Sequence, residues 1–123
     1  MRFMMMVKHP EISGPPPRAL MDAIDKITQE AINNKTLVVA GGLMPLAQSN
    51  AVKISGGKLS VIDGPFSEAK EVVGGFAIFD LKSKEEALEG AKQFMELHRQ
   101  HWPGWEGTTE VRQMFGPDEF PPR

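Results

Sequence analysis

The most constraining feature of the chain is the sequence Asp63-Gly64-Pro65-Phe66, near its middle. Proline fixes φ and has no N–H, and it biases the residue before it away from the helical region. A strand that reaches this sequence must therefore turn. We expect the Asp63 side chain to accept a hydrogen bond from a backbone N–H beyond Pro65, and the Phe66 ring to anchor the turn on the core.

Apolar periodicity predicts six strands and two helices. Apolar runs indicate strands at 3–7, 37–41, 51–54, 59–62, 72–81 and 110–115. The first helix, over 18–33, follows three prolines, which are tolerated in a first helical turn, and its apolar residues recur at helical spacing. We expect Asn34 to close this helix in a left-handed conformation.

The second helix is predicted to begin at a capping-box pattern formed by Ser83 and Glu86. Its buried face should carry Ala87, Leu88, Ala91, Phe94, Met95 and His98. The segment 99–107 is expected to be irregular.

Two glycine pairs indicate particular backbone geometry. Gly56-Gly57 separates the third and fourth strands and supplies the positive φ angles of a tight hairpin turn. Apolar and polar residues alternate on both sides of this turn, so the hairpin should have one solvated face and form an arm at the edge. Gly74-Gly75, inside a strand, indicates a bulge or a close backbone approach.

The order strand, helix, strand, hairpin, strand, helix, strand predicts an α+β fold of the ferredoxin-like type with an inserted hairpin. Two helices cover one face of such a sheet, whereas the strands at 3–7 and 76–79 are apolar at successive positions. A two-fold partner whose sheet packs on the open face would cover it, so we expect a homodimer. The alternative is that loops at 42–50 and 99–107 fold over the sheet within one chain.

Composition narrows the function classes. The 123 residues, of which 41% are hydrophobic, suffice for one domain. A net charge of −2 and a pI near 5.9 provide no basic surface for nucleic acid. The absence of cysteine excludes disulfides and thiolate chemistry, and no run is long and apolar enough for a signal peptide or a membrane span. We expect a cytoplasmic protein that needs no cofactor.

The three histidines are candidate acid–base groups. His9 ends the first strand, and His98 and His101 lie three residues apart at the end of the second helix, on one side of a helical turn. Two local ligands without cysteine are too few for a structural metal site, so we expect none. Trp102 and Trp105 would either wall a ligand pocket or plug the end of the sheet and contact a partner.

Together, Asp63-Gly64-Pro65-Phe66, Gly74-Gly75 and Glu110-Val111-Arg112 resemble the DGPF branch of the YCII-related family, and the resemblance spans nearly the whole chain. It implies a dimeric α+β barrel. Many members of the wider family carry a His in the first helix and an Asp after the second as an acid–base pair, but here 18–33 contains no His and 99–107 no Asp. Members of the branch also occur fused to, or encoded near, sigma factors, which implies an accessory role in transcription.

Two hypotheses follow. In the first, the protein is an enzyme or a ligand-binding protein that uses a cavity between its sheet and the partner. In the second, it is a non-catalytic accessory module that binds a protein partner. A titratable pair in a dry pocket would favour the first, and an exposed apolar patch the second. The candidate acid–base groups are His9, Asp63, His98 and His101, and the candidate ligand contacts are Phe66, Trp102 and Trp105.

Overall fold

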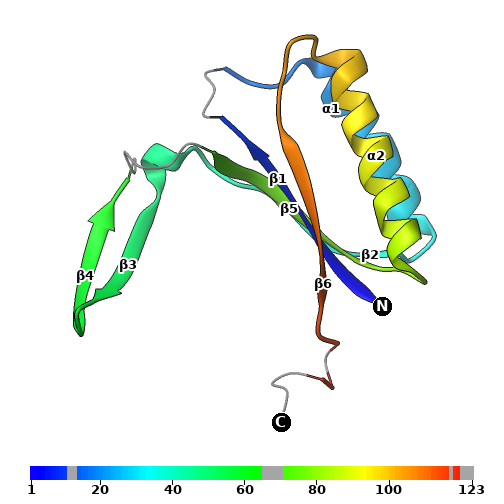
Figure 1. The fold of residues 1–123 in the computed structure, drawn as a ribbon. Coiled ribbons are helices and arrows are strands. Elements are labelled where there is room, and N and C mark those ends of the chain that lie inside the picture. Colours follow the sequence, from blue (N-terminus) through cyan, green and yellow to red (C-terminus); the bar gives the residue numbers. More distant parts are fainter. Residues whose placement is uncertain (11–13, 65–70, 117, 120–123) are drawn as a thin grey trace.

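The computed structural model of the protein describes residues 1–10, 14–64, 71–116 and 118–119. It consists of a four-stranded antiparallel sheet with two helices on one face and a separate two-stranded hairpin (Figure 1). The elements are β1 (Arg2–His9), α1 (Arg18–Asn33), β2 (Leu37–Gly42), the 3-10 turn η1 (Leu46–Gln48), β3 (Asn50–Ser55), β4 (Lys58–Asp63), β5 (Val72–Asp80), α2 (Lys84–His101) and β6 (Thr108–Met114). The predicted order of elements is confirmed.

The sheet has the strand order β2-β5-β1-β6, and every neighbouring pair is antiparallel. This is an α+β arrangement compatible with the ferredoxin-like fold. β1 lies between β5 and β6, so its side chains occupy the middle of the sheet (Figure 1). The end of β1 therefore brings His9 close to the end of α2 and the loop that follows α2.

The core lies between the sheet and α2. Phe3 and Met5 on β1 pack against Ala87 and Ala91 on α2. The small alanine side chains allow the helix to approach the strands closely, so the large residues of β1 fill the space between them. α1 adds Leu20, its one fully buried residue among those described.

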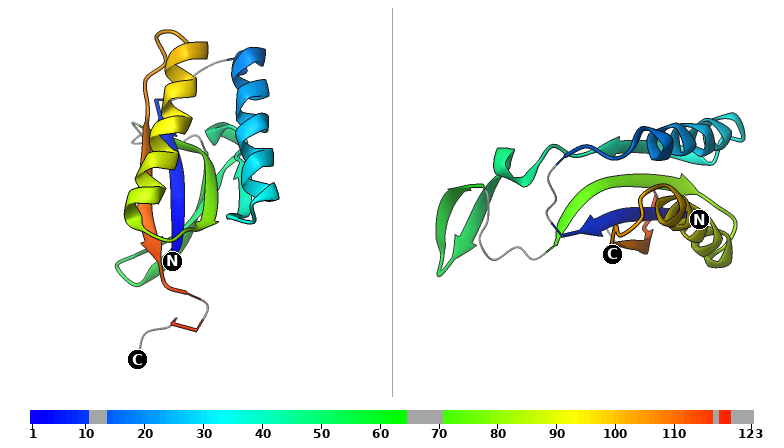
Figure 2. Two further views of the ribbon diagram at one scale, coloured as in Figure 1. Left: turned by 90° about the vertical axis from the view of Figure 1, so that its right-hand side faces the viewer. Right: turned by 90° about the horizontal axis from the view of Figure 1, so that it is seen from above.

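The other face of the sheet has no helix over it (Figure 2). Met4 and Met6 alternate with the core residues of β1 and lie on this face, half-buried. Within one chain, β1 is thus fully buried on one side only. Trp102 and Trp105 of the segment 99–107 contact α2 and do not cover the open face.

The start of α1 agrees with the prediction, whereas the conformation at its end differs from it. Pro17 precedes the helix, and its carbonyl accepts a hydrogen bond from the Leu20 N–H at 3.1 Å. Asn34 has φ −90°, so its predicted left-handed conformation is wrong. Lys35, with φ +62°, is the left-handed residue, because the chain turns one residue later, where the Thr36 N–H bonds back to Ala31.

α2 begins as predicted, since the Glu86 N–H donates to the Ser83 side chain at 3.1 Å. The helix continues to His101, however, so the expectation that 99–107 is irregular is wrong for its first three residues. Leu88 is 41% exposed and not buried as predicted. It lies one residue, or about 100°, round the helix from Ala87, which faces the core.

The hairpin of β3 and β4 projects away from the sheet (Figures 1 and 2). Its turn has φ +57° at Gly56 and +77° at Gly57, as predicted. Val52 pairs with Val61 and Ile54 with Leu59, and all four side chains are 71–72% exposed. The prediction that only one face of the hairpin is solvated is therefore wrong for a single chain, because both faces of the arm are exposed.

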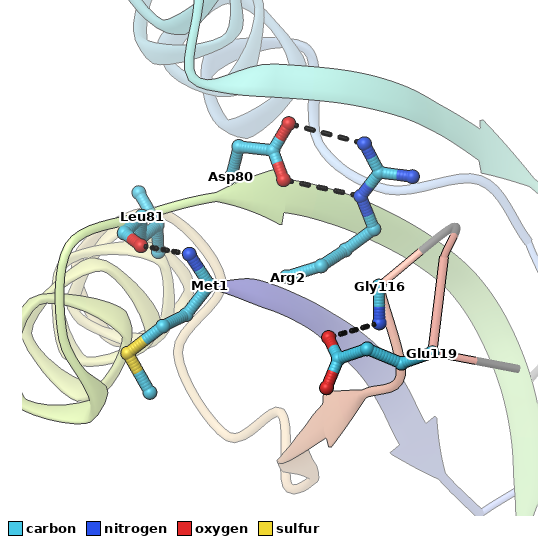
Figure 3. A network of polar contacts seen from close by, with 6 residues as sticks. All are labelled: Met1, Arg2, Asp80, Leu81, Gly116 and Glu119. Carbon is cyan, nitrogen blue, oxygen red and sulfur yellow. Dashed lines mark hydrogen bonds and ion pairs between the residues drawn. The ribbon is translucent and has the colours of Figure 1, made fainter. Parts of the chain in front are cut away.

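Polar contacts hold the beginning of β1 against the end of β5 (Figure 3). The Met1 amino group donates to the Leu81 carbonyl at 2.8 Å, and the Arg2 guanidinium makes two hydrogen bonds to Asp80, at 3.1 and 3.2 Å. The bond from Arg2 lowers the pKa of the Asp80 carboxyl. Of the helices in the described ranges, none has the length and apolarity needed to cross a bilayer.

Candidate functional site

An open cavity of about 1390 Å³ lies between the two helices and the face of the sheet that they cover. Its lining, mainly apolar, includes Ile24 and Ile27 of α1, Phe94 of α2, and Met5 and Val7 of β1. Apolar walls with a few polar groups are typical of small-molecule sites. We expected a cavity between the sheet and a partner, but elements of a single chain enclose this one, because most of the apolar face of α1 is not packed against the sheet.

Five rings gather at one end of the cavity, and we call them the histidine–tryptophan cluster: His9, Phe94, His98, Trp102 and Trp105. The centroid of the Trp105 ring lies 4.4 Å from that of His98, 6.1 Å from that of Trp102 and 6.2 Å from that of His9. His98 also contacts Phe94, at 4.7 Å. The strand end, the helix end and the following loop thus each contribute rings to one site.

His98 is the buried titratable group of this cluster, with 6% of its surface exposed. Its Nδ1 lies 3.0 Å from the Phe94 carbonyl oxygen, which can only accept, so Nδ1 carries the proton in the neutral ring. Burial lowers the pKa of His98; the Phe94 hydrogen bond opposes this effect, and the nearby His9 adds to it. Because an unperturbed histidine titrates near 6.5, the ring is neutral at pH 7.

Nε2 is the second nitrogen of the His98 ring, and the ring lines both the cavity and a smaller neighbouring hollow. No hydrogen bond to Nε2 occurs within the described part of the chain, and no fully buried side-chain nitrogen or oxygen there lacks a partner. Nε2 is therefore not completely buried. In the neutral tautomer it is an acceptor, able to take a hydrogen bond or a proton from a bound molecule.

His9 is placed by a bulge between β1 and β5. The register shifts between Val7 and Lys8, and a Cβ on Gly74 would lie 2.4 Å from His9 Nε2. Gly74 thus leaves room for the imidazole, and the register shift confirms the bulge predicted at the Gly74-Gly75 pair. The Nδ1 of His9 lies 2.7 Å from the Pro10 carbonyl, so this ring also bonds to the backbone through Nδ1.

Trp105 depends on a glycine that sequence reasoning missed. A Cβ on Gly107 would lie 2.3 Å from Trp105 Cη2 and 2.8 Å from the Lys8 carbonyl oxygen. Only a residue without a side chain allows the loop to bring the indole back against His98. The spacing Trp-x-Gly in a loop is the only sequence signal of this arrangement, and it is too common to be decisive.

The remaining predicted site residues lie elsewhere. Asp63 ends β4, is exposed, and accepts a hydrogen bond from the Asn50 side chain; it does not line the cavity. His101 is the last residue of α2 and does not line the cavity either. Phe66 lies outside the described residues, as do the expected backbone partners of Asp63 beyond Pro65. In the described ranges, no three His, Asp or Glu side chains are grouped to hold a metal ion.

Comparison with known proteins gives the family of the chain. The model of the YCII-related domain matches residues 1–96. The chain belongs to the YCII-related family. It is also 33% identical over 81 residues to an uncharacterized protein of Rhizobium meliloti (strain 1021), an alignment that covers 64% of this chain and 61% of that protein. The chain thus matches less than two thirds of that relative.

The YCII-related match includes β1 and β5, with His9 and Gly74, but it ends two residues before His98. His98, Trp102 and Trp105 therefore lie in the part of the chain that the family model does not cover. The site combines a strand from the YCII-related region with rings from the segment that follows it.

Proposed function

We propose that the protein binds a small molecule in the cavity and performs acid–base chemistry on it, with the histidine–tryptophan cluster as the reactive end. The observation that carries this proposal is His98: a neutral imidazole, almost fully buried, whose Nε2 has no hydrogen-bond partner among the described residues. A buried titratable group beside a second one, in a largely apolar cavity, is a common arrangement at active sites.

The two imidazoles suit a division of roles. A positive charge on His9 disfavours one on His98, so His98 stays in the form that accepts a proton. His98 Nε2 would take a proton from the bound molecule, and His9, at the more open end of the cluster, would exchange protons with solvent. The indoles exclude water from the side of His98 that Trp105 covers.

We propose further that the protein belongs to the DGPF branch. We also propose that it forms a homodimeric α+β barrel in the cytoplasm. The sequence Asp63-Gly64 at the end of β4 and the glycines in β5 support the branch. The uncovered, half-buried methionines of β1 support a partner on the open face of the sheet. A dimer of this kind leaves the cavity free, because the cavity lies on the helix-covered face.

A fragment screen observed through the histidine side chains tests the binding function. Small aromatic molecules that enter the cavity should shift the Cε1–H resonances of His9 and His98. His101, which does not line the cavity, is the control within the same chain. Fragments that shift all three resonances equally, or none of them, would show that the cluster is a packing feature and not a site.

The hairpin favours a second candidate function, a non-catalytic module that binds another protein. Four apolar side chains, paired across β3 and β4, are exposed on one face of the arm. Replacing Ile54 and Leu59 by Ser should then abolish capture of a protein partner, such as a sigma factor, while the fragment shifts at His98 persist. Unchanged capture would remove this candidate.

A further inference from the structure

The charges around the cavity indicate which molecules it can accept. Among the described residues that line it, none is Lys or Arg, whereas four are glutamates: Glu30, Glu71, Glu86 and Glu89. None of these four carboxylates forms an ion pair within the described ranges. The cations Lys92 and Arg99 of α2 line a second, smaller hollow, which shares His98, Trp102 and Trp105 with the cavity.

Exposed acidic residues alone do not define a site, but His98 supplies an independent requirement. Its Nδ1–H is used by the Phe94 carbonyl, so Nε2 of this cavity-lining ring keeps a lone pair that has no partner among the described residues. A ligand that satisfies this atom must donate a hydrogen bond. A carboxylate has no proton to donate at neutral pH and would leave Nε2 without a hydrogen bond.

The aromatic rings point to the same ligand chemistry. Trp102 and Trp105 lie 6.1 Å apart in a stacked arrangement, and both line the cavity. The face of an indole attracts a cation through its quadrupole. The cavity, at about 1390 Å³, also has ample room for an apolar body beside the charged group.

From these observations we propose that the cavity takes an amphipathic organic cation: an amine whose ammonium N–H groups donate to His98 Nε2 and whose apolar body lies along α1 and the sheet. The inference rests on the proposed function, since it names the ligand class of the same site. The glutamates at the cavity attract the cation, and the indoles contact it directly.

Three probes with one apolar body and three charges test the ligand class: 4-phenylbutylamine, 4-phenylbutan-1-ol and 4-phenylbutyrate. Titration calorimetry gives their dissociation constants, and the His98 Cε1–H resonance shows whether they occupy the cavity. We expect the amine to bind about sixteen times more tightly than the alcohol, because the four carboxylates each contribute roughly twofold at physiological salt. The carboxylate should bind most weakly.

A matched pair of double variants tests whether the preference for the amine comes from the carboxylates that line the cavity. Glu30→Gln/Glu89→Gln removes one carboxylate from each helix wall and should weaken amine binding about fourfold while leaving the alcohol unchanged. Asp25→Asn/Glu85→Gln makes the same change in net charge on the same two helices, at positions that do not line the cavity. This control should leave the binding of all three probes unchanged.

The outcomes separate the two proposals. If the alcohol and the carboxylate shift His98 and bind as tightly as the amine, the site exists but its ligand is not a cation, and the inference is overturned. Equal weakening of amine binding in both double variants would overturn it too, because the effect would then be one of net charge. If none of the three probes shifts His98, the inference fails, and the fragment screen alone then decides the proposed function.

Discussion

At the scale of single residues, His98 illustrates how burial and one backbone hydrogen bond define a titratable group. The ring is held by the Phe94 carbonyl on one side and covered by Trp105 on the other. Burial favours the neutral form and therefore lowers the pKa of His98. The same contacts fix the tautomer, so Nε2 is an acceptor.

This lowered pKa predicts a dependence of stability on pH. In the unfolded chain His98 titrates near 6.5, whereas the folded ring binds a proton only at lower pH. Above pH 6.5 His98 is neutral in both the folded and the unfolded chain, so its contribution to the free energy of unfolding is fully present. As the pH falls from 6.5 through the folded pKa, the unfolded chain takes up a proton first, and the free energy of unfolding decreases. Urea unfolding between about pH 8 and pH 5 measures this decrease.

The control for this prediction is a comparison of variants. His98→Gln should lose the component of the decrease that the wild type shows below 6.5, whereas His101→Gln, at a less buried position, should keep it. Carboxylates titrate alike in all three proteins, so their contribution cancels in the comparison. If the wild type and His98→Gln have identical pH profiles, His98 is not buried as described.

At the scale of elements, the bulge where β5 meets β1 determines where His9 points. The strands are in register up to Val7, and the extra residue Gly74 then lets His9 lie against β5. A regular ladder would leave no space there for the imidazole. The bulge therefore positions His9, a residue of the sheet, at the site.

Replacing Gly74 by Ala tests whether the bulge positions His9. The new Cβ would be 2.4 Å from His9 Nε2, and since that atom is the end of a side chain, the ring should rotate away at a cost of about 0.5–1.5 kcal/mol. We expect a shifted His9 Cε1–H resonance and weaker fragment binding in a folded protein. Gly42→Ala is the matched control, because nothing lies within 4 Å of a Cβ there. If both variants leave His9 unchanged, the bulge does not position it.

At the scale of the whole molecule, the two faces of the sheet have different roles. The helix-covered face holds both the core and the cavity, while the other face presents the methionines of β1 without cover (Figure 2). A second copy packed on the open face would bury these methionines without obstructing the cavity. The arm, exposed on both faces, would project beside such a partner.

Light scattering at micromolar concentration should therefore show a homodimer. A specific interface of this kind buries more than about 1,000 Å² of total surface. Met4→Glu places a charge on the open face and should shift the protein to monomer, whereas Leu88→Glu, on the exposed side of α2, should leave the dimer intact. A wild-type protein that is monomeric under these conditions would contradict the dimer and leave the open face unexplained.

The order of the elements and the starts of both helices could be read from the sequence because their signals are local. Three prolines start α1, the Ser83 cap starts α2, and a glycine pair makes the hairpin turn. Each signal acts within a few residues, so no distant contact is needed to interpret it. The predictions failed where the result depended on a shift of one residue. At Asn34 the left-handed conformation falls one residue later in the turn, and Leu88 lies one residue round the helix from the buried face.

The site was decided by tertiary structure. His9 and His98 are candidates by residue type alone, and only the antiparallel sheet and the packing of α2 bring them beside Trp105. Asp63 and His101 looked equally suitable in the sequence, but the arm and the helix end place them outside the cavity. The reason is physical: burial, which lowers the pKa of His98 and leaves its Nε2 as an acceptor, is a property of the packed chain and not of the local sequence.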